Sequence, residues 1–337
     1  MKYAEVLDRA RERMAPNCKV CPVCDGRGCR STPAGGPGGG QGFIRNYDRL
    51  HQIRIHMDTI YDHKEQDTSL PLFGRTFAAP VFAAPIANVG RSYSSALTEE
   101  EYARAVILGC AAAGCAAFTG DGLKEEFFTL PLPYITQAGT GIPTLKPMSP
   151  EITLPKLRRA EEAGADAVAM DIDAVAFQPL LEFGRGVMPR GVEALREIIS
   201  ATRLPFLLKG IMTPQGAEKA ARAGAYGIVV SNHGGRSLAD AMATCDVLPG
   251  IRRAVGGDLK ILVDGGFRTG ADIFKARALG ADAVLIGRPY SAAAYGGGAE
   301  GVELLTRRLR EQLAETMTLA GCATLEEITS DKIAWER

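Results

Sequence analysis

Eight short apolar segments recur along the chain after residue 80, each followed by a glycine or polar turn and then by a longer helical stretch. Their apolar character is continuous enough for burial on both faces, as in the strands of a parallel sheet. Eight alternating strands and helices predict an α/β fold of the (β/α)8 TIM-barrel type. The expected strands cover residues 81–86, 115–119, 142–146, 167–171, 205–209, 226–231, 260–264 and 282–287.

Helices are expected between these strands at residues 99–113, 150–163, 191–201, 214–223 and 271–279, with a closing helix from about residue 298 to 319. A chain of 337 residues with 46% hydrophobic content can build one large core and is too short to require two. We therefore expect one barrel at residues 46–337. An extension at residues 1–45 should hold an N-terminal helix, a cysteine-rich segment and a glycine-rich connector.

The charges of the chain balance, with 39 lysines and arginines against 39 aspartates and glutamates. No long-range field therefore recruits nucleic acid or an anionic membrane surface. No apolar run approaches the roughly 20 residues that span a bilayer, and the first residues form a charged amphipathic pattern unlike a signal peptide. We expect a cytoplasmic protein whose partner is a small molecule.

The sixth expected strand ends at Ser231, the first residue of the motif Ser-Asn-His-Gly-Gly-Arg at residues 231–236. Active sites of α/β folds lie at the carboxyl ends of their strands. His233 is the only one of the four histidines that lies in the repeating part of the chain. Its ordinary pKa of about 6.5 suits a general base, and the guanidinium of Arg236 can grip a carboxylate through two hydrogen bonds. A structural histidine is the alternative.

Other strands end in polar residues that should converge on the same mouth. The ammonium of Lys209, after four largely apolar residues, would be partly desolvated and able to stabilise a developing anion, although a salt bridge is the alternative. Asp171 could hold the His233 imidazole in the required tautomer. The converging set is Asp171, Lys209, Ser231, His233, Arg236, Asp264, Arg268 and Arg288.

Two glycine-containing loops follow the seventh and eighth strands, at residues 263–270 and 285–289. These loops are the usual phosphate-binding site of this barrel, where amides, a helix N-terminus and arginines act as donors. The two loops together predict a phosphate group on the ligand.

Several segments resemble one known family: Leu-Lys-Gly at residues 208–210, the histidine motif at 231–236, Asp-Gly-Gly-Phe-Arg at 264–268, Gly-Arg-Pro at 287–289, and residues 72–86. They are similar to the signatures of the FMN-dependent α-hydroxy-acid oxidases and dehydrogenases, which include glycolate oxidase, lactate oxidase and flavocytochrome lactate dehydrogenase. The resemblance runs from about residue 40 to the C-terminus. It implies oxidation of a 2-hydroxy acid or related carbinol substrate, with a hydride, or its equivalent as a carbanion, moving from the α-carbon to flavin N5.

The resemblance also implies roles for individual residues. Lys209 would lie by flavin N1 and O2, His233 would take the substrate hydroxyl proton with support from Asp171, and Arg236 would hold the substrate carboxylate. The residues implied to bind FMN, besides Lys209, are Pro85, Ile86, Ala87, Ser231, Asp264, Gly266, Arg268, Gly287 and Arg288. The family often forms tetramers, so we expect a homo-oligomer.

The third strand departs from the family pattern. Lys146 stands where the family presents a tyrosine to the substrate, and residues 30–41 contain no aromatic counterpart of a second family tyrosine. Lys146 would suit a substrate with a further anionic group, or it would pair with a protein carboxylate. The identity of the substrate stays open.

Two glycine-rich segments carry further expectations. Residues 33–42 should lack regular structure and form either a linker or a loop that approaches a ligand. Residues 183–191 carry Arg185 and Arg190 on a loop after the fourth strand, which predicts either a lid that contacts the substrate through Arg185 or a plain surface loop.

Four of the eight cysteines, Cys18, Cys21, Cys24 and Cys29, lie within twelve residues. This spacing predicts zinc or an iron–sulfur cluster, with reduced or redox-active thiols as the alternative. A cluster could pass electrons from flavin to an external acceptor that the sequence does not identify. The other four cysteines sit in apolar or helical contexts and should be core residues.

Two other functions compete with a hydroxy-acid oxidoreductase. One is an FMN-dependent isomerase resembling the type 2 isopentenyl diphosphate isomerases, against which the pairing of His233 with Arg236 argues. The other is a non-catalytic protein whose barrel carries flavin while the cysteine segment docks a partner.

Overall fold

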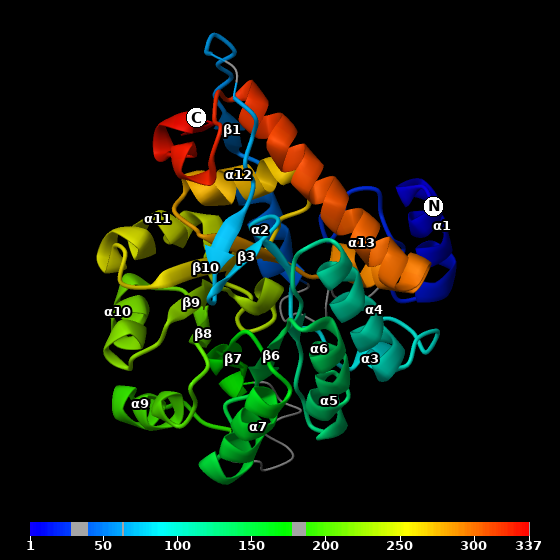
Figure 1. The fold of residues 1–337 in the computed structure, drawn as a ribbon, viewed down its shortest axis with the longest axis vertical. Coiled ribbons are helices and arrows are strands. Elements are labelled where there is room, and N and C mark those ends of the chain that lie inside the picture. Colours follow the sequence, from blue (N-terminus) through cyan, green and yellow to red (C-terminus); the bar gives the residue numbers. More distant parts are fainter. Residues whose placement is uncertain (28–39, 63, 177–186, 337) are drawn as a thin grey trace.

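Eight parallel strands surround the centre of the molecule in the computed structural model, which describes residues 1–27, 40–62, 64–176 and 187–336 (Figure 1). The strands are β4 (Val81–Ala83), β5 (Phe118–Thr119), β6 (Ile142–Leu145), β7 (Val168–Asp171), β8 (Phe206–Ile211), β9 (Gly227–Val230), β10 (Lys260–Asp264) and β11 (Ala283–Ile286). A parallel bridge between Ala83 and Ala117 joins β4 to the segment entering β5. The predicted (β/α)8 barrel is thereby confirmed.

The barrel strands are apolar because helices cover their outer faces and side chains fill the interior. All four residues of β6, β7, β9 and β11 are buried. Lys260, the first residue of β10, is the exposed exception because it lies at the amino-terminal rim. At Gly227 a Cβ atom would lie 2.5 Å from the Lys260 carbonyl oxygen, so glycine permits the close approach of β9 and β10.

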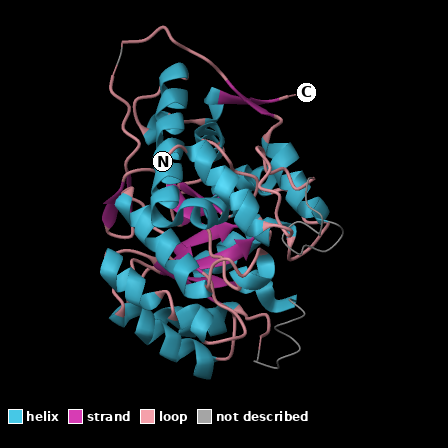
Figure 2. Cartoon of the chain, turned by 90° about the vertical axis from the view of Figure 1, so that its right-hand side faces the viewer, coloured by secondary structure: helices cyan, strands magenta, loops and turns pink. Residues whose placement is uncertain are grey.

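The helices form the outer layer, shown in cyan around the magenta strands in Figure 2. They are α3 (Val89–Ser92), α4 (Glu99–Ala112), α5 (Glu126–Thr129), α6 (Leu132–Ala138), α7 (Pro150–Glu162), α9 (Val192–Ser200), α10 (Pro214–Arg222), α11 (Thr244–Val255), α12 (Gly270–Ala278) and α13 (Arg288–Leu319). The expected helices are present to within one or two residues, except that α13 begins ten residues early. Gly298, with φ 57°, interrupts α13, so the sequence pattern revealed only the second half of this helix.

Within the described residues, two helices precede the barrel. α1 (Tyr3–Met14) packs along α13, where Gly296 leaves room for the backbone of Val6 (Figure 1). α2 (Gln41–Leu50) begins inside the segment that we expected to be irregular, so that expectation is wrong for Gln41 and Gly42. The fold stabilises α2 because it buries Phe43, Asn46 and Leu50 on one face. The rest of the glycine-rich segment, residues 33–39, lies outside the described part of the chain.

Short strands and turns complete the described chain. β1 (Ile53–Ile55) pairs antiparallel with β12 (Ile333–Trp335), and β2 (Leu70–Leu72) forms a hairpin with β3 (Arg75–Phe77). The 3-10 turns are η3 (Ile172–Ala176), η4 (His233–Gly235), η5 (Leu325–Glu327) and η6 (Ser330–Lys332). Within the described residues, no helix combines the length and apolar character needed to cross a membrane.

Candidate active site

Charged side chains meet at the carboxyl ends of β6, β7, β8 and β10. Asp171 ends β7 and pairs in register with Lys209 of β8, while Asp264 ends β10. Lys146 follows the last residue of β6. Parallel strands bring these positions to one rim, as the sequence predicted.

Asp171 lies between two lysines. Its Oδ2 is 2.6 Å from Lys146 Nζ and its Oδ1 is 3.0 Å from Lys209 Nζ. Burial alone raises the pKa of Asp171, but the two ammonium groups outweigh it and hold the pKa well below its usual range. Of the two expected roles for Lys146, pairing with a protein carboxylate is observed.

Lys209 keeps its charge despite being almost completely buried. Burial lowers its pKa, but the carboxylates of Asp171 and Asp264 outweigh that effect and raise the pKa above its ordinary value. Asp264 lies farther away, with Oδ2 3.6 Å from Lys209 Nζ, and accepts hydrogen bonds of 2.8 Å from the Ser231 hydroxyl at both oxygens. The barrel mouth therefore presents a fixed, desolvated cation.

His233 pairs with Asp173, and the expectation that Asp171 would hold the imidazole is wrong. Nδ1 of His233 lies 3.1 and 3.2 Å from the two oxygens of Asp173, a residue of η3. Asp171 instead faces the two lysines. At Gly210 a Cβ atom would lie 2.5 Å from the Asp173 Cβ, so glycine after Lys209 leaves space for this aspartate.

Asp173 was not among the predicted site residues, although the sequence contains a signal for it. Asp171 and Asp173 alternate in an Asp-Ile-Asp run, and the second aspartate lies just past the end of β7. A residue beyond a strand end reaches farther over the mouth than the last residue of the strand. Asp173 can therefore reach the imidazole of His233 more easily than Asp171 can.

The imidazole of His233 is neutral near pH 7. Burial, followed by the positive charge of Lys209, lowers its pKa below 6.5, and the carboxylates of Asp173 and Asp171 offset this only in part. Because a carboxylate accepts, Nδ1 carries the hydrogen and the lone pair lies on Nε2. A neutral imidazole in this tautomer can accept a proton at Nε2.

The backbone around His233 depends on α2. Asn46 and Asn232 exchange two side-chain hydrogen bonds of 2.8 and 2.9 Å, both buried. His233 has a left-handed φ of 58°, and Gly235 lies so close to α2 that a Cβ atom would be 2.3 Å from the Phe43 nitrogen. Gly235 of the histidine motif therefore permits the contact between η4 and α2.

Arg236 follows η4, and its backbone N–H donates to the His233 carbonyl at 3.3 Å. Burial is the main cause that lowers the pKa of Arg236, although the guanidinium stays protonated at neutral pH. A poorly solvated guanidinium gains from a carboxylate partner. This position suits the predicted contact with an anionic substrate group.

Three buried oxygens line the ends of neighbouring strands β5, β6 and β7. Among the residues that the structure describes, the hydroxyls of Thr119 and Thr144 have no hydrogen-bond partner, and Asp171 Oδ1 contacts Lys209 without hydrogen-bond geometry. An unpaired buried polar group costs about 1–3 kcal/mol. The register places Thr144 and Asp171 on the face of the sheet that carries Lys209, where a ligand with a polar edge, such as the ring system of FMN, would satisfy them. Thr119 pairs in register with Pro143 and therefore faces α4 on the other side of the sheet. Neither threonine was among the residues predicted from the sequence.

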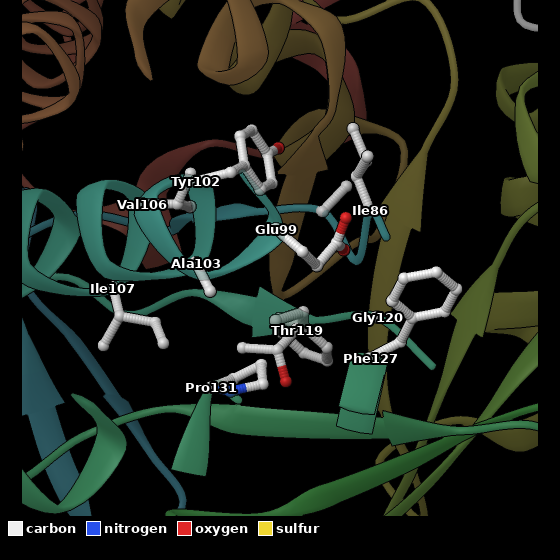
Figure 3. A pocket seen from close by; sticks show the side chains of 12 residues that line it. Ile86, Glu99, Tyr102, Ala103, Val106, Ile107, Thr119, Gly120, Phe127 and Pro131 are labelled. Carbon is white, nitrogen blue, oxygen red and sulfur yellow. The ribbon is translucent and has the colours of Figure 1, made fainter. Parts of the chain in front are cut away.

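A small pocket adjoins Thr119 and is lined mainly by apolar side chains (Figure 3). The empty space of the pocket and its open mouth together is about 300 Å³, and Ile86 and Gly120 lie in its wall. The carboxylate of Glu99, also in the wall, accepts the N–H groups of Asn88 and Val89 at 2.9 and 3.0 Å. Glu99 thereby fixes the backbone that follows the predicted flavin-facing residues 85–87.

Two arginines mark the predicted phosphate region. Arg288 and Arg268 lie over the ring of Phe43, at 4.5 and 5.4 Å from its centroid, and Arg268 also donates to the Cys24 carbonyl at 2.8 and 3.0 Å. The first amides of α12 are already bonded, since Asp272 accepts from the backbones of residues 268 and 269 and Gln312 accepts from that of residue 270. The Arg268 guanidinium is itself engaged, since Nη1 also donates to the Phe267 carbonyl at 2.7 Å. The two arginines are the charged donors that lie nearest the predicted phosphate position.

The structure describes three of the four cysteines of the predicted metal site, Cys18, Cys21 and Cys24. Among the described residues, these three cysteines do not converge as a group of metal ligands. The one group of three potential ligands that does converge in this part of the chain is Asp171, Asp173 and His233 at the barrel mouth, where both aspartates are paired as described above. Cys29 and Arg185 lie outside the described residues. The remaining cysteines, Cys110, Cys115, Cys245 and Cys322, are buried core residues as predicted, and burial raises the pKa of each thiol.

A parallel barrel with a fixed cation and a neutral imidazole beside a carboxylate at one mouth has the site of a barrel enzyme that acts by proton transfer and charge stabilisation. The family model for FMN-dependent dehydrogenases matches residues 30–179 and 186–335. The chain belongs to this family, and the predicted fold, cofactor FMN and oxidoreductase class are confirmed.

Individual relatives agree with this assignment. The 4-hydroxymandelate oxidase of Amycolatopsis orientalis is 31% identical over 337 residues, covering 87% of this chain and 89% of that protein. The L-lactate oxidase of Alicycliphilus denitrificans is 39% identical over 219 residues, which is 54% of this chain and 60% of the relative. The structure of a mandelate oxidase Y128F mutant with (S)-mandelic acid superposes with a TM-score of 0.80 at 31% identity, covering 97% and 96% of the chains. These relatives do not favour the isomerase alternative.

Proposed function

We propose that this protein oxidises a 2-hydroxy acid with one carboxylate to the corresponding 2-oxo acid. The observation that carries the proposal is the His233–Asp173 pair beside Lys209 and Arg236 at one barrel mouth. FMN, when bound, takes up the hydrogen and electron pair that leave the substrate α-carbon. The names of the relatives, which include lactate, mandelate and 2-hydroxyacid oxidases, support this substrate class.

The protein side chains divide the remaining work. His233 Nε2 accepts the proton of the substrate hydroxyl, and Asp173 stabilises the imidazolium that results. Arg236 binds the substrate carboxylate and so orients the α-carbon. Because Lys146 is engaged by Asp171, a second anionic group on the substrate is not required.

The cofactor would be held along the same mouth. Lys209, with Thr144, would face the polar edge of the ring, while Arg268 and Arg288 would bind the phosphate. The other residues proposed to contact FMN are Pro85, Ile86, Ala87, Ser231, Asp264, Gly266 and Gly287. A contact of Arg185 with the substrate remains a prediction.

An anaerobic visible spectrum tests the proposed reaction. We expect the flavin bands of the purified protein to bleach after addition of a 2-hydroxy acid, with L-lactate, glycolate and (S)-mandelate as probes. Mandelate and lactate carry a single carboxylate, which matches Arg236 as the anchor. A flavin spectrum that none of these acids bleaches would contradict the proposal.

The pH profile tests the role of Asp173. Its negative charge raises the pKa of His233, so Asp173→Asn should lower that pKa further. Activity requires the neutral imidazole, so the acid limb of kcat/KM should move to lower pH while the rate falls about 10²-fold. An acid limb that stays in place would remove Asp173 from this role; Asp240→Asn, an exposed aspartate on the following loop, is the control.

We also propose, from cysteine spacing alone, that Cys18, Cys21, Cys24 and Cys29 bind zinc or an iron–sulfur cluster. Protein purified without oxygen should then contain about one zinc, or iron with acid-labile sulfide, per chain. The absence of all three would contradict this assignment. The electron acceptor is unassigned, and a homotetramer remains a prediction that light scattering can test.

A further inference from the structure

Lys146 and Asp171 extend the charged row that contains Lys209, and none of the roles assigned above explains why the row includes them. Lys146 and Lys209 flank Asp171 at 2.6 and 3.0 Å, one on each carboxylate oxygen. The three side chains come from adjacent strands β6, β7 and β8 or the residue directly after them. Asp171 and Lys209 are each 3% exposed at the side chain and Lys146 is 10% exposed, so water screens these charges weakly.

Sharing of one carboxylate changes the charge that Lys209 presents. With Lys209 alone, Asp171 would form a neutral pair at the barrel mouth. Lys146 adds a second cation, so the group of three carries a net charge of +1 in its usual protonation states. Asp264 lies 3.6 Å from Lys209 and adds a negative charge beside it even though Ser231 donates to it, so the cation of Lys146 is needed to offset this second carboxylate.

We propose that Lys146 is a positioning residue that acts through Asp171 to keep Lys209 effectively positive toward bound FMN. This inference rests on the proposed place of FMN beside Lys209. A more positive surrounding stabilises the negative charge that a flavin gains on reduction. Lys146 therefore raises the reduction potential of the cofactor, and Asp171 lowers it.

The test is the two-electron midpoint potential of the FMN-loaded protein, measured against a reference dye without any substrate. Lys146→Met should shift the reduction equilibrium about tenfold against the reduced state, which is about 30 mV lower. Asp171→Asn should shift it about tenfold in the opposite direction. Opposite signs are expected because the two variants remove opposite charges from the same row.

Two further variants separate charge from packing. Lys146→Arg retains the cation and should restore the wild-type potential to within about twofold in the equilibrium. Arg252→Met breaks a 2.7 Å ion pair with Asp282, which precedes β11 at the opposite rim. It should leave the potential unchanged, even where it lowers thermal stability.

The results also distinguish this inference from the proposed reaction. Shifts of the same sign in Lys146→Met and Asp171→Asn, or no shift in Lys146→Met, would overturn the inference. A raised KM for the 2-hydroxy acid with an unchanged potential would instead assign Lys146 to substrate binding and overturn it as well. If no 2-hydroxy acid bleaches the flavin but the potentials shift as expected, the proposed substrate fails and the inference stands. If Asp171→Asn does not retain FMN, Lys146→Met and Lys146→Arg still decide the question.

Discussion

Replacement of His233 by alanine should reduce turnover of the 2-hydroxy acid about 10³-fold, with FMN still bound. The imidazole supplies the proton acceptor at Nε2, because its Nδ1 is hydrogen-bonded to Asp173. The other three histidines, His51, His56 and His63, all precede the first barrel strand in the sequence. Stopped-flow measurement of flavin bleaching gives the rate, and the visible spectrum of the resting protein gives the flavin content.

The control for this variant is His56→Ala. His56 is exposed and contacts the Asp331 backbone carbonyl at 2.8 Å, away from the barrel mouth. It should retain full activity. If the His233 variant turns over at the wild-type rate, the general base has been misassigned. If the wild-type protein shows no turnover and the His233 variant still binds a partner protein, the non-catalytic alternative gains support.

Replacement of both Arg268 and Arg288 by methionine should release FMN from the protein. In our proposal the two guanidinium groups supply the charged donors to the phosphate, and Arg268 gives up its bonds to the Cys24 and Phe267 carbonyls to do so. Two charged donors at about 2 kcal/mol each correspond to about 10³-fold weaker binding. Flavin fluorescence after titration of the apoprotein with FMN measures the change.

Matched exposed arginines control for the loss of charge. Arg54 and Arg307, both more than half exposed and ion-paired to glutamates, can be replaced together. That double variant should bind FMN normally. Tight retention of FMN by the Arg268 and Arg288 variant would contradict the phosphate site, and the single Arg268→Met variant shows whether loss of the Cys24 contact alone has an effect.

Local sequence was sufficient for most of the barrel. Apolar runs predicted all eight strands because a strand that is buried on both faces consists of consecutive apolar residues. Helix caps were also local, as at Thr98 and Thr269, where Glu101 and Asp272 complete capping boxes. α2 was missed because its stability comes from contacts with η4, with α11 and with Gly265 and Gly266 after β10, while its first residues lie in a glycine-rich stretch.

The residue types of the active site were recognisable in the sequence, but their pairings were not. The sequence by itself determined the barrel, its family, and the presence of His233, Arg236 and Lys209 at strand ends. Only the tertiary structure decided that Asp173 meets the imidazole and that Asp171 lies between two lysines. The physical reason is that the apolar character of consecutive residues shows that a strand is buried. Contacts across the barrel mouth depend instead on strand stagger and on the space left by residues such as Gly210.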